Sequence, residues 1–424
     1  MKIEQALALL PEFAILRPLR DAVLSAASGN GGPAWSDAGS DLTIGKRAVV
    51  PGELAQRIPG LVQQVADHLA RLYAAYAGVL EAEVSGDGPA TVEALLRAAA
   101  IEANWHRARQ ALGWARVAVR VAGQLQTRRP EVEGLLLVGQ LERQLGQYAE
   151  AARALQRALA LAEGEFDQAG AMAACRGLGA VATAQGDWPG AEAWLTRALG
   201  LAGNVGEAAA VPAIRRELGV LAGRQAEFGR AYEQLRQAAA AFEAGRDPAE
   251  MARTLDAFGA VEVSAGRHAE AMARLREALA WARRVERDGD LEVGIRLTLA
   301  ALFEAMGQSL EAEQELRRAE QVATATGRHP RLIEIYVRLG DLRGDQRDEG
   351  GFVFFEQAII LCRKLECGAV AEADVFRRYG RFRAKIGQHD DARNLLAHAR
   401  ELLQALGSDA HLRHLDDELA QLGA

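Results

Sequence analysis

Residues 135–163 read LLLVGQLERQLGQYAEAARALQRALALAE, and this stretch decides the fold because its pattern returns about every 40 residues. Within it, Ala151, Leu155 and Ala158 are four and three residues apart, so they share one face of a helix. The last of these positions recurs at intervals of 39 to 43 residues, as Ala115, Ala158, Ala198, Ala238, Ala278, Ala319, Ala358 and Ala399. A period of this length is typical of stacked units that each pack on their neighbours.

Two glycine positions predict how one unit folds into a first helix, A, and a second helix, B. The glycine of the turn between them suits the left-handed conformation that ends a helix, and it recurs as Gly146, Gly186, Gly266, Gly307 and Gly387. Seven residues earlier, inside helix A, stand Gly139, Gly179, Gly219, Gly259, Ala300 and Gly380. A glycine inside a helix costs about 0.5–1 kcal/mol relative to alanine. We therefore expect helix A to cross helix B closely at this position.

The spacing of these residues resembles that of the tetratricopeptide repeat. Two units that match nearly throughout are Gly139…Gly146-x-Tyr148…Ala151…Leu155…Ala158 and Gly179…Gly186-x-Trp188…Ala191…Leu195…Ala198. The resemblance covers about 90–407 and implies an all-α fold, a right-handed solenoid of eight antiparallel helix pairs. Units longer than the usual length of about 34 residues are similar to the long-repeat branch, which includes kinesin light chains and bacterial peptide-sensing regulators.

The chain is expected to have three parts. Residues 1–88 form a helical N-terminal module, with helical periodicity at 61–84 and a Gly/Ser-rich loop at 28–52. Residues 89–407 form the solenoid, and 408–424 form a C-terminal capping helix. The chain has few long β-branched runs, so we do not expect a sheet. Near 344–352 the spacing drops by one residue, which predicts a local irregularity.

Composition excludes several classes of function. The net charge of −7 argues against direct binding of nucleic acid, which needs a basic surface. The start of the chain is a poor signal peptide, and no window has the 18 or so uncharged apolar residues of a membrane helix. The three cysteines form no Cys-x-x-Cys pair, which favours reduced thiols and a cytoplasmic location. Cys362 and Cys367 are expected to point to different sides of one helix.

No pattern of residues predicts catalysis, a cofactor or a metal. Residues 39–47 have five residues rather than four between the glycines of a phosphate loop, and Arg47 stands where the hydroxyl is required. His411 and His414 are one helical turn apart but have no evident third ligand. We therefore expect a protein that is not an enzyme.

Charged residues on helix A are the candidate binding site, because helix A lines the concave groove in the family that the chain resembles. The basic candidates are Arg143, Arg176, Arg216, Arg224, Arg253, Arg377, Arg381 and Lys385. An acidic stretch lies between them in the sequence and contains Glu304, Glu334, Asp341 and Asp345. This pattern favours an extended or helical partner of complementary charge that carries an acidic segment. The alternative is a solvated helix face, on which arginine is common.

The leading hypothesis is a cytoplasmic, non-catalytic scaffold that binds a protein or peptide in this groove. The alternative is a sensor, in which a peptide alters the solenoid and the 1–88 module relays the change or pairs with a second copy. An enzyme with an unrecognised site is the remote third hypothesis. The sequence does not identify the partner.

Overall fold

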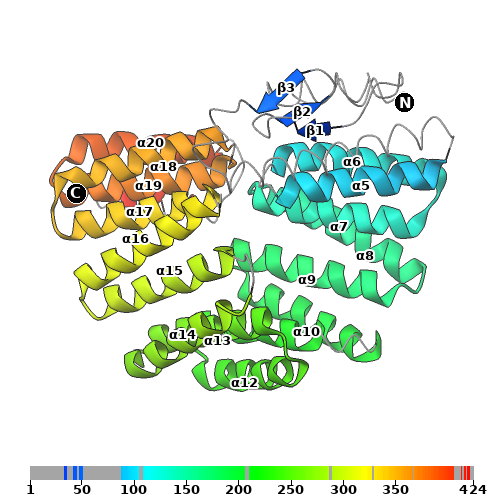
Figure 1. The fold of residues 1–424 in the computed structure, drawn as a ribbon, viewed down its shortest axis with the longest axis horizontal. Coiled ribbons are helices and arrows are strands. Elements are labelled where there is room, and N and C mark those ends of the chain that lie inside the picture. Colours follow the sequence, from blue (N-terminus) through cyan, green and yellow to red (C-terminus); the bar gives the residue numbers. More distant parts are fainter. Residues whose placement is uncertain are drawn as a thin grey trace. The chain divides into compact units, whose positions relative to one another are not determined.

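The computed structural model describes three short strands near the start of the chain and nearly all of the repeat region (Figure 1). The described residues are 33–35, 42–44, 47–50, 87–104, 108–205, 210–285, 289–326, 329–365, 367–404, 412, 415–416 and 418–420. The predicted helix at 61–84, both His411 and His414, and most of the predicted capping helix lie outside these residues.

The repeat region is all-α, with sixteen α-helices among the described residues, α5 to α20, that alternate as helices A and B. The A helices are α5 (Gly88–Asn104), α7 (Arg128–Gln144), α9 (Gln168–Gln185), α11 (Ala210–Arg224), α13 (Pro248–Ser264), α15 (Gly289–Ala305), α17 (His329–Asp345) and α19 (Ala369–Lys385). The B helices are α6 (Ala108–Leu125), α8 (Tyr148–Gly164), α10 (Trp188–Val205), α12 (Phe228–Gly245), α14 (His268–Ala282), α16 (Ser309–Ala325), α18 (Phe352–Lys364) and α20 (His389–Gln404).

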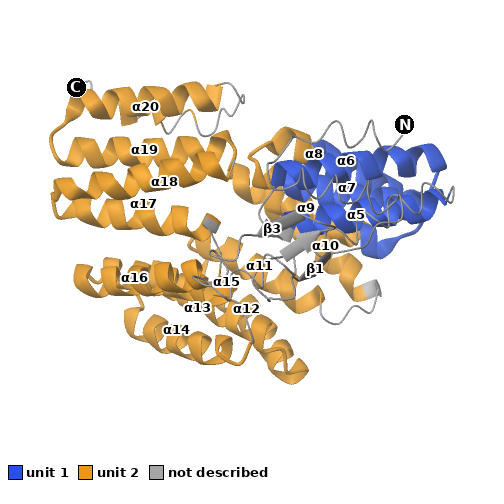
Figure 2. Ribbon diagram, turned by 45° about the horizontal axis from the view of Figure 1, so that its top comes forward, with its two compact units in different colours: residues 1–142, 153–170 blue, residues 143–152, 171–424 orange. Residues whose placement is uncertain are grey.

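The chain divides into two compact units, coloured separately in Figure 2. Unit 1 comprises 1–142 and 153–170, and unit 2 comprises 143–152 and 171–424. Unit 2 therefore contains nearly all of α9 and every helix from α10 to α20.

The expected close crossing of helices A and B is confirmed at the glycine position. A Cβ atom added to Gly139 would lie 2.5 Å from Cγ of Leu155, on the helix that follows. The same clash recurs at 2.9 Å between Gly179 and Leu195, at 2.7 Å between Gly219 and Leu235, at 2.6 Å between Gly259 and Leu275, and at 2.8 Å between Gly380 and Leu396. Each leucine thus fills the space that its glycine leaves, which is why the glycine's cost to the helix is tolerated.

The predicted small-large-small face of helix B is buried. Ala231, Leu235 and Ala238 of α12 are each 0% exposed. The corresponding residues of α14 and α16 are also 0% exposed, namely Ala271, Leu275, Ala278, Ala312, Leu316 and Ala319. The hydrophobic core therefore runs along the array instead of gathering in one centre, as expected for stacked repeats.

We did not expect a sheet, but part of the segment at 28–52 forms one. Three short antiparallel strands lie there in the order β1–β2–β3: β1 (Pro33–Trp35), β2 (Leu42–Ile44) and β3 (Arg47–Val50). Only two residues separate β2 from β3, and Ile44 pairs with Arg47, as in a short hairpin. The segments Leu42-Thr43-Ile44 and Ala48-Val49-Val50 are rich in β-branched residues, which favour strands. The glycines around them led to the prediction of a loop instead.

The irregularity predicted at 344–352 is a turn of 3-10 helix, η1 (Glu349–Gly351), which precedes α18. The Asp348 side chain accepts a hydrogen bond from the Gly350 backbone N–H at 2.9 Å. Beyond α18, the prediction that Cys362 and Cys367 lie on one helix is wrong, because the helix ends at Lys364. The Cys367 backbone N–H donates to the Cys362 carbonyl oxygen at 3.1 Å, and the two thiols shift each other's pKa. Both cysteines are free.

Candidate functional site

The eight predicted basic residues all lie on A helices of the structure, on what we call the A-helix face. Arg143 is in α7, Arg176 in α9, Arg216 and Arg224 in α11, Arg253 in α13, and Arg377, Arg381 and Lys385 in α19. All eight belong to unit 2. The structure therefore places them in one compact unit, and their partners decide what they can do.

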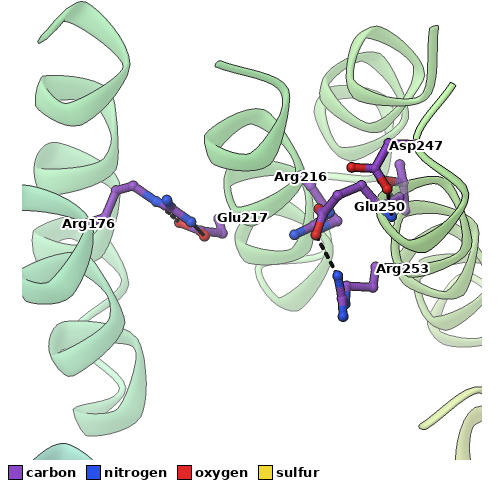
Figure 3. Close-up of polar contacts among 7 residues, drawn as sticks. Arg176, Arg216, Glu217, Asp247, Glu250 and Arg253 are labelled. Atoms are coloured by element: carbon purple, nitrogen blue, oxygen red, sulfur yellow. Dashed lines mark hydrogen bonds and ion pairs between the residues drawn. The ribbon is translucent and has the colours of Figure 1, made fainter. Parts of the chain in front are cut away.

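Arg176 forms an ion pair with Glu217 of the next A helix (Figure 3). Its Nη2 donates to Oε1 of Glu217 at 2.5 Å, and both side chains are 34% exposed. Burial lowers the pKa of Arg176, but the hydrogen bond and charge of Glu217, together with the charge of Glu250, raise it overall. The guanidinium is thus held in place yet remains open to solvent.

Glu250, in the first turn of α13, joins two more of the predicted arginines (Figure 3). It pairs with Arg216 of α11 and, at 2.6 Å, with Arg253 of its own helix. Its backbone N–H donates to the Asp247 side chain at 3.0 Å, which caps the helix. Burial raises the pKa of Glu250, but the two arginines outweigh this and lower it below its usual range. The two guanidinium groups therefore share one ionised carboxylate.

The predicted acidic stretch is also paired. Glu304 accepts a hydrogen bond from Arg338 at 2.9 Å, and Glu334 lies 3.3 Å from Arg331. Asp341 pairs with Arg378, and Asp345 pairs with Lys385, which is itself a predicted basic residue. The acidic stretch and the basic end thus neutralise each other in part.

Three predicted residues have other surroundings. Arg377 lies 3.0 Å from Glu418 and 2.6 Å from Asp374, and Arg381 also pairs with Glu418. Arg224, at the end of α11, lies over the ring of Trp188 at 6.0 Å.

Arg143 is half-buried near Tyr148. Burial raises the pKa of Tyr148, and the charge of Arg143 lowers it.

These pairs change how the charge pattern is understood. The sequence suggested separate basic and acidic stretches, but partners lie about one repeat apart and so come together on adjacent A helices. The separation is 41 residues for Arg176 and Glu217, and 40 for Asp345 and Lys385. A search for opposite charges one repeat apart would have found both pairs.

Asp256 is a site residue that the sequence reasoning missed. It lies on α13, 40 residues after Arg216, which itself follows Arg176 by 40 residues. Its Oδ1 is buried and accepts no hydrogen bond from the residues that the structure describes. Burial raises the pKa of Asp256 to about 6, although Thr298 and the charge of Arg331 act in the opposite direction. The repeat position could have identified it, because an acid there replaces an arginine.

The described part of the chain contains no cluster of three or more histidine, cysteine, aspartate or glutamate residues suited to a metal ion. Within the same residues, no helix has the length and apolar character needed to cross a membrane.

Solved structures with the same fold include a Rap conjugation gene regulator of plasmid pLS20, in complex with the Phr* peptide. It is 15% identical, with a TM-score of 0.53, and the match covers 83% of this chain and 95% of that one. The apo form of RapI is 15% identical with a TM-score of 0.51, over 65% of this chain and 99% of that one. The chain has a tetratricopeptide-like repeat fold. No protein-family model matches this repeat protein, and no curated protein matches its sequence.

Proposed function

We propose that the A-helix face of unit 2 binds a peptide, or a peptide-like segment of a protein, without catalysing a reaction. The observation that carries the proposal is the row of arginine–carboxylate pairs on adjacent A helices, typified by Arg176 and Glu217. A peptide carries carboxylates for the guanidinium groups and N–H donors for the carboxylates, so it can use both members of such a pair.

The pairs support binding because they hold the side chains in place before a ligand arrives. An arginine fixed by its neighbour loses less conformational freedom on binding than a free one. The Phr* peptide bound to the Rap regulator supports a peptide as the class of ligand. The proposal also includes an acidic segment in the ligand and a cytoplasmic location for the protein.

The experiment reverses one pair without removing it. Short random peptides are displayed and selected on the full chain, and the affinity of the selected peptides is measured by calorimetry. The double variant Arg176→Glu/Glu217→Arg keeps an ion pair but exchanges its charges. We expect this variant to unfold at nearly the wild-type temperature and to bind the peptides at least about tenfold more weakly.

The control reverses the pair Glu233 and Arg236, which lies on B helix α12. Glu233→Arg/Arg236→Glu should leave peptide affinity unchanged. Unchanged affinity in the Arg176/Glu217 variant, or a selection in which no peptide is enriched, would contradict the proposal.

A second function, that of a peptide-responsive regulator, is favoured by the likeness to a gene regulator. In this function, binding on the A-helix face is relayed to the module at 1–88. We expect a selected peptide to change hydrogen exchange at 28–52 or 61–84. The opposing outcome is a peptide that binds by calorimetry and yet leaves hydrogen exchange in both ranges unchanged. That result would exclude the regulator function and would be consistent with a binding scaffold.

A further inference from the structure

A pocket of about 580 Å³ lies in unit 2 between two B helices, α14 and α16, and the A helix α15 that packs against both. Leu299 and Phe303 of α15 and Met272 and Leu279 of α14 give it an apolar floor. None of the eight basic residues that define the A-helix face lines this pocket, so the two sites are separate.

One wall carries two arginines whose side chains have no partner among the described residues. Arg276 of α14 and Arg283, the residue that directly follows this helix, are exposed. Neither side chain makes a hydrogen bond or an ion pair with any residue that the structure describes. Their neighbours differ: Arg274 lies over the Phe258 ring at 5.1 Å, and Arg284 over the Trp281 ring at 4.3 Å. The guanidinium groups of Arg276 and Arg283 are therefore available to a ligand.

The opposite wall does not cancel this charge. Glu315 of α16 is already held by Arg296 at 2.8 Å and by Arg318. Glu311 is the other acid, and the lining as a whole contains four arginines and two glutamates. A positive pocket on a chain whose net charge is −7 selects for an anionic ligand.

We propose that this pocket, the α14–α16 pocket, binds an acidic amphipathic helix of a partner protein. Arg276 and Arg283 are seven residues apart, and Arg283 continues the helical conformation past the end of α14. The two residues therefore lie about 10 Å apart along one helical face. A single small carboxylate cannot bridge that distance. A helix with acidic residues at i and i+7 and apolar residues between them matches both arginines and the floor. In an extended segment, residues about 10 Å apart are three positions apart and face opposite sides.

The experiment uses the full chain and a display library of amphipathic helices whose surface positions are randomised. We expect the enriched helices to carry acidic residues seven positions apart. Their affinity, measured by fluorescence anisotropy, should fall at least about tenfold on Arg276→Glu/Arg283→Glu, because two attractive contacts become repulsive. The control is Arg246→Glu, at an exposed arginine whose side chain makes no ion pair or hydrogen bond with a described residue, and it should leave affinity unchanged.

Three results would overturn the inference. One is a library with no enriched helix, and another is equal binding to the wild type and to the Arg276/Arg283 variant. The third is full displacement of a bound helix by millimolar citrate, which would mark a small-anion site. The Arg176→Glu/Glu217→Arg variant should bind the helices normally, so failure here and failure of the proposed function are distinguishable.

Discussion

Asp256 is a buried acid at a repeat position where the two preceding units carry arginine. Its folded-state pKa of about 6 lies above the ordinary value, so the folded chain takes up this proton at a higher pH than the unfolded chain does. The ionised side chain therefore opposes folding at neutral pH, and this penalty disappears as the pH falls through about 6 towards 4.

We predict that Asp256→Asn raises the free energy of unfolding at about pH 7.5 by roughly 1–3 kcal/mol, because the buried charge is removed. The gain should shrink at about pH 5, where the wild-type side chain is largely protonated in the folded state. Urea unfolding at both pH values measures this. The control, Asp374→Asn at a half-exposed ion pair, should change stability by less than about 1 kcal/mol. An equal gain at both pH values would contradict the role assigned to burial.

Cys367 is the thiol for which we predict the highest reactivity. A hydrogen bond from Cys362 lowers its pKa, while burial and the charge of Glu372 act in the opposite direction. We expect a maleimide to label Cys367 faster than Cys175 or Cys362, which are both buried. Cys362→Ala should slow this labelling roughly threefold near neutral pH, whereas Cys362→Ser keeps a donor and should have a smaller effect. Mass spectrometry of the labelled peptides measures these rates. Equal labelling rates of Cys367 in the wild type and in Cys362→Ala would show that the hydrogen bond has no effect.

At the scale of the element, the turn between helices A and B depends on one backbone conformation. Gly186 has a φ of +76°, and Ala226 adopts +60° at the same position one repeat later. We predict that Ala226→Gly stabilises the protein by about 0.5–1 kcal/mol, because alanine is strained there. Gly186→Ala should destabilise by about 1 kcal/mol, and an added Cβ there meets nothing within 4 Å, so only the backbone is tested. Changes of the same sign in the two variants, measured by urea unfolding, would contradict this account.

The glycine at the crossing of helices A and B is tested by Gly219→Ala, whose Cβ would meet Leu235 at 2.7 Å. We expect a loss of about 1–3 kcal/mol from overpacking. Leu235→Ala in the same chain should cost less than it does in the wild type, because it makes room for the new methyl group. The control is Gly229→Ala on the partner helix, where the added Cβ has open space. Additive effects of the 219 and 235 substitutions in chemical unfolding would exclude a direct clash.

At the scale of the whole molecule, the core is a chain of neighbouring clusters. One cluster joins α12 to α15, from Ala238 to Leu302, and a separate one joins α19, α20 and Leu415. Stability in such arrays is a sum of local and nearest-neighbour terms. We predict that Gly219→Ala lowers hydrogen-exchange protection in α11 to α13 and leaves α19 and α20 unchanged. An equal loss of protection throughout unit 2 would show a single cooperative unit.

The sequence predicts the helix pairs well because their signal is repeated many times. Gly139, Leu155 and their counterparts each mark a contact inside one pair, and such local contacts are readable from spacing alone. The strands at 33–50 were missed because each is three or four residues long and none is repeated.

The sequence predicted the basic residues of the candidate site but not their partners. Position on helix A located Arg176 and Arg216, but their partners depend on how adjacent units pack. Asp256 and the α14–α16 pocket required the structure for the same reason. The burial of Asp256 and the lack of side-chain partners for Arg276 and Arg283 depend on how adjacent repeats pack. The turn at Cys367 depended on where α18 ends, which spacing does not fix.

The pair between Arg176 and Glu217 also links two events that are usually separate. A ligand that uses both members of this pair competes with the contact between them, and Glu217 belongs to the neighbouring helix α11. Ligand binding therefore weakens an ion pair that joins α9 to α11. The distance between these two helices becomes a gauge of whether the ligand is present, so spectroscopic labels placed on them would report binding without touching the ligand.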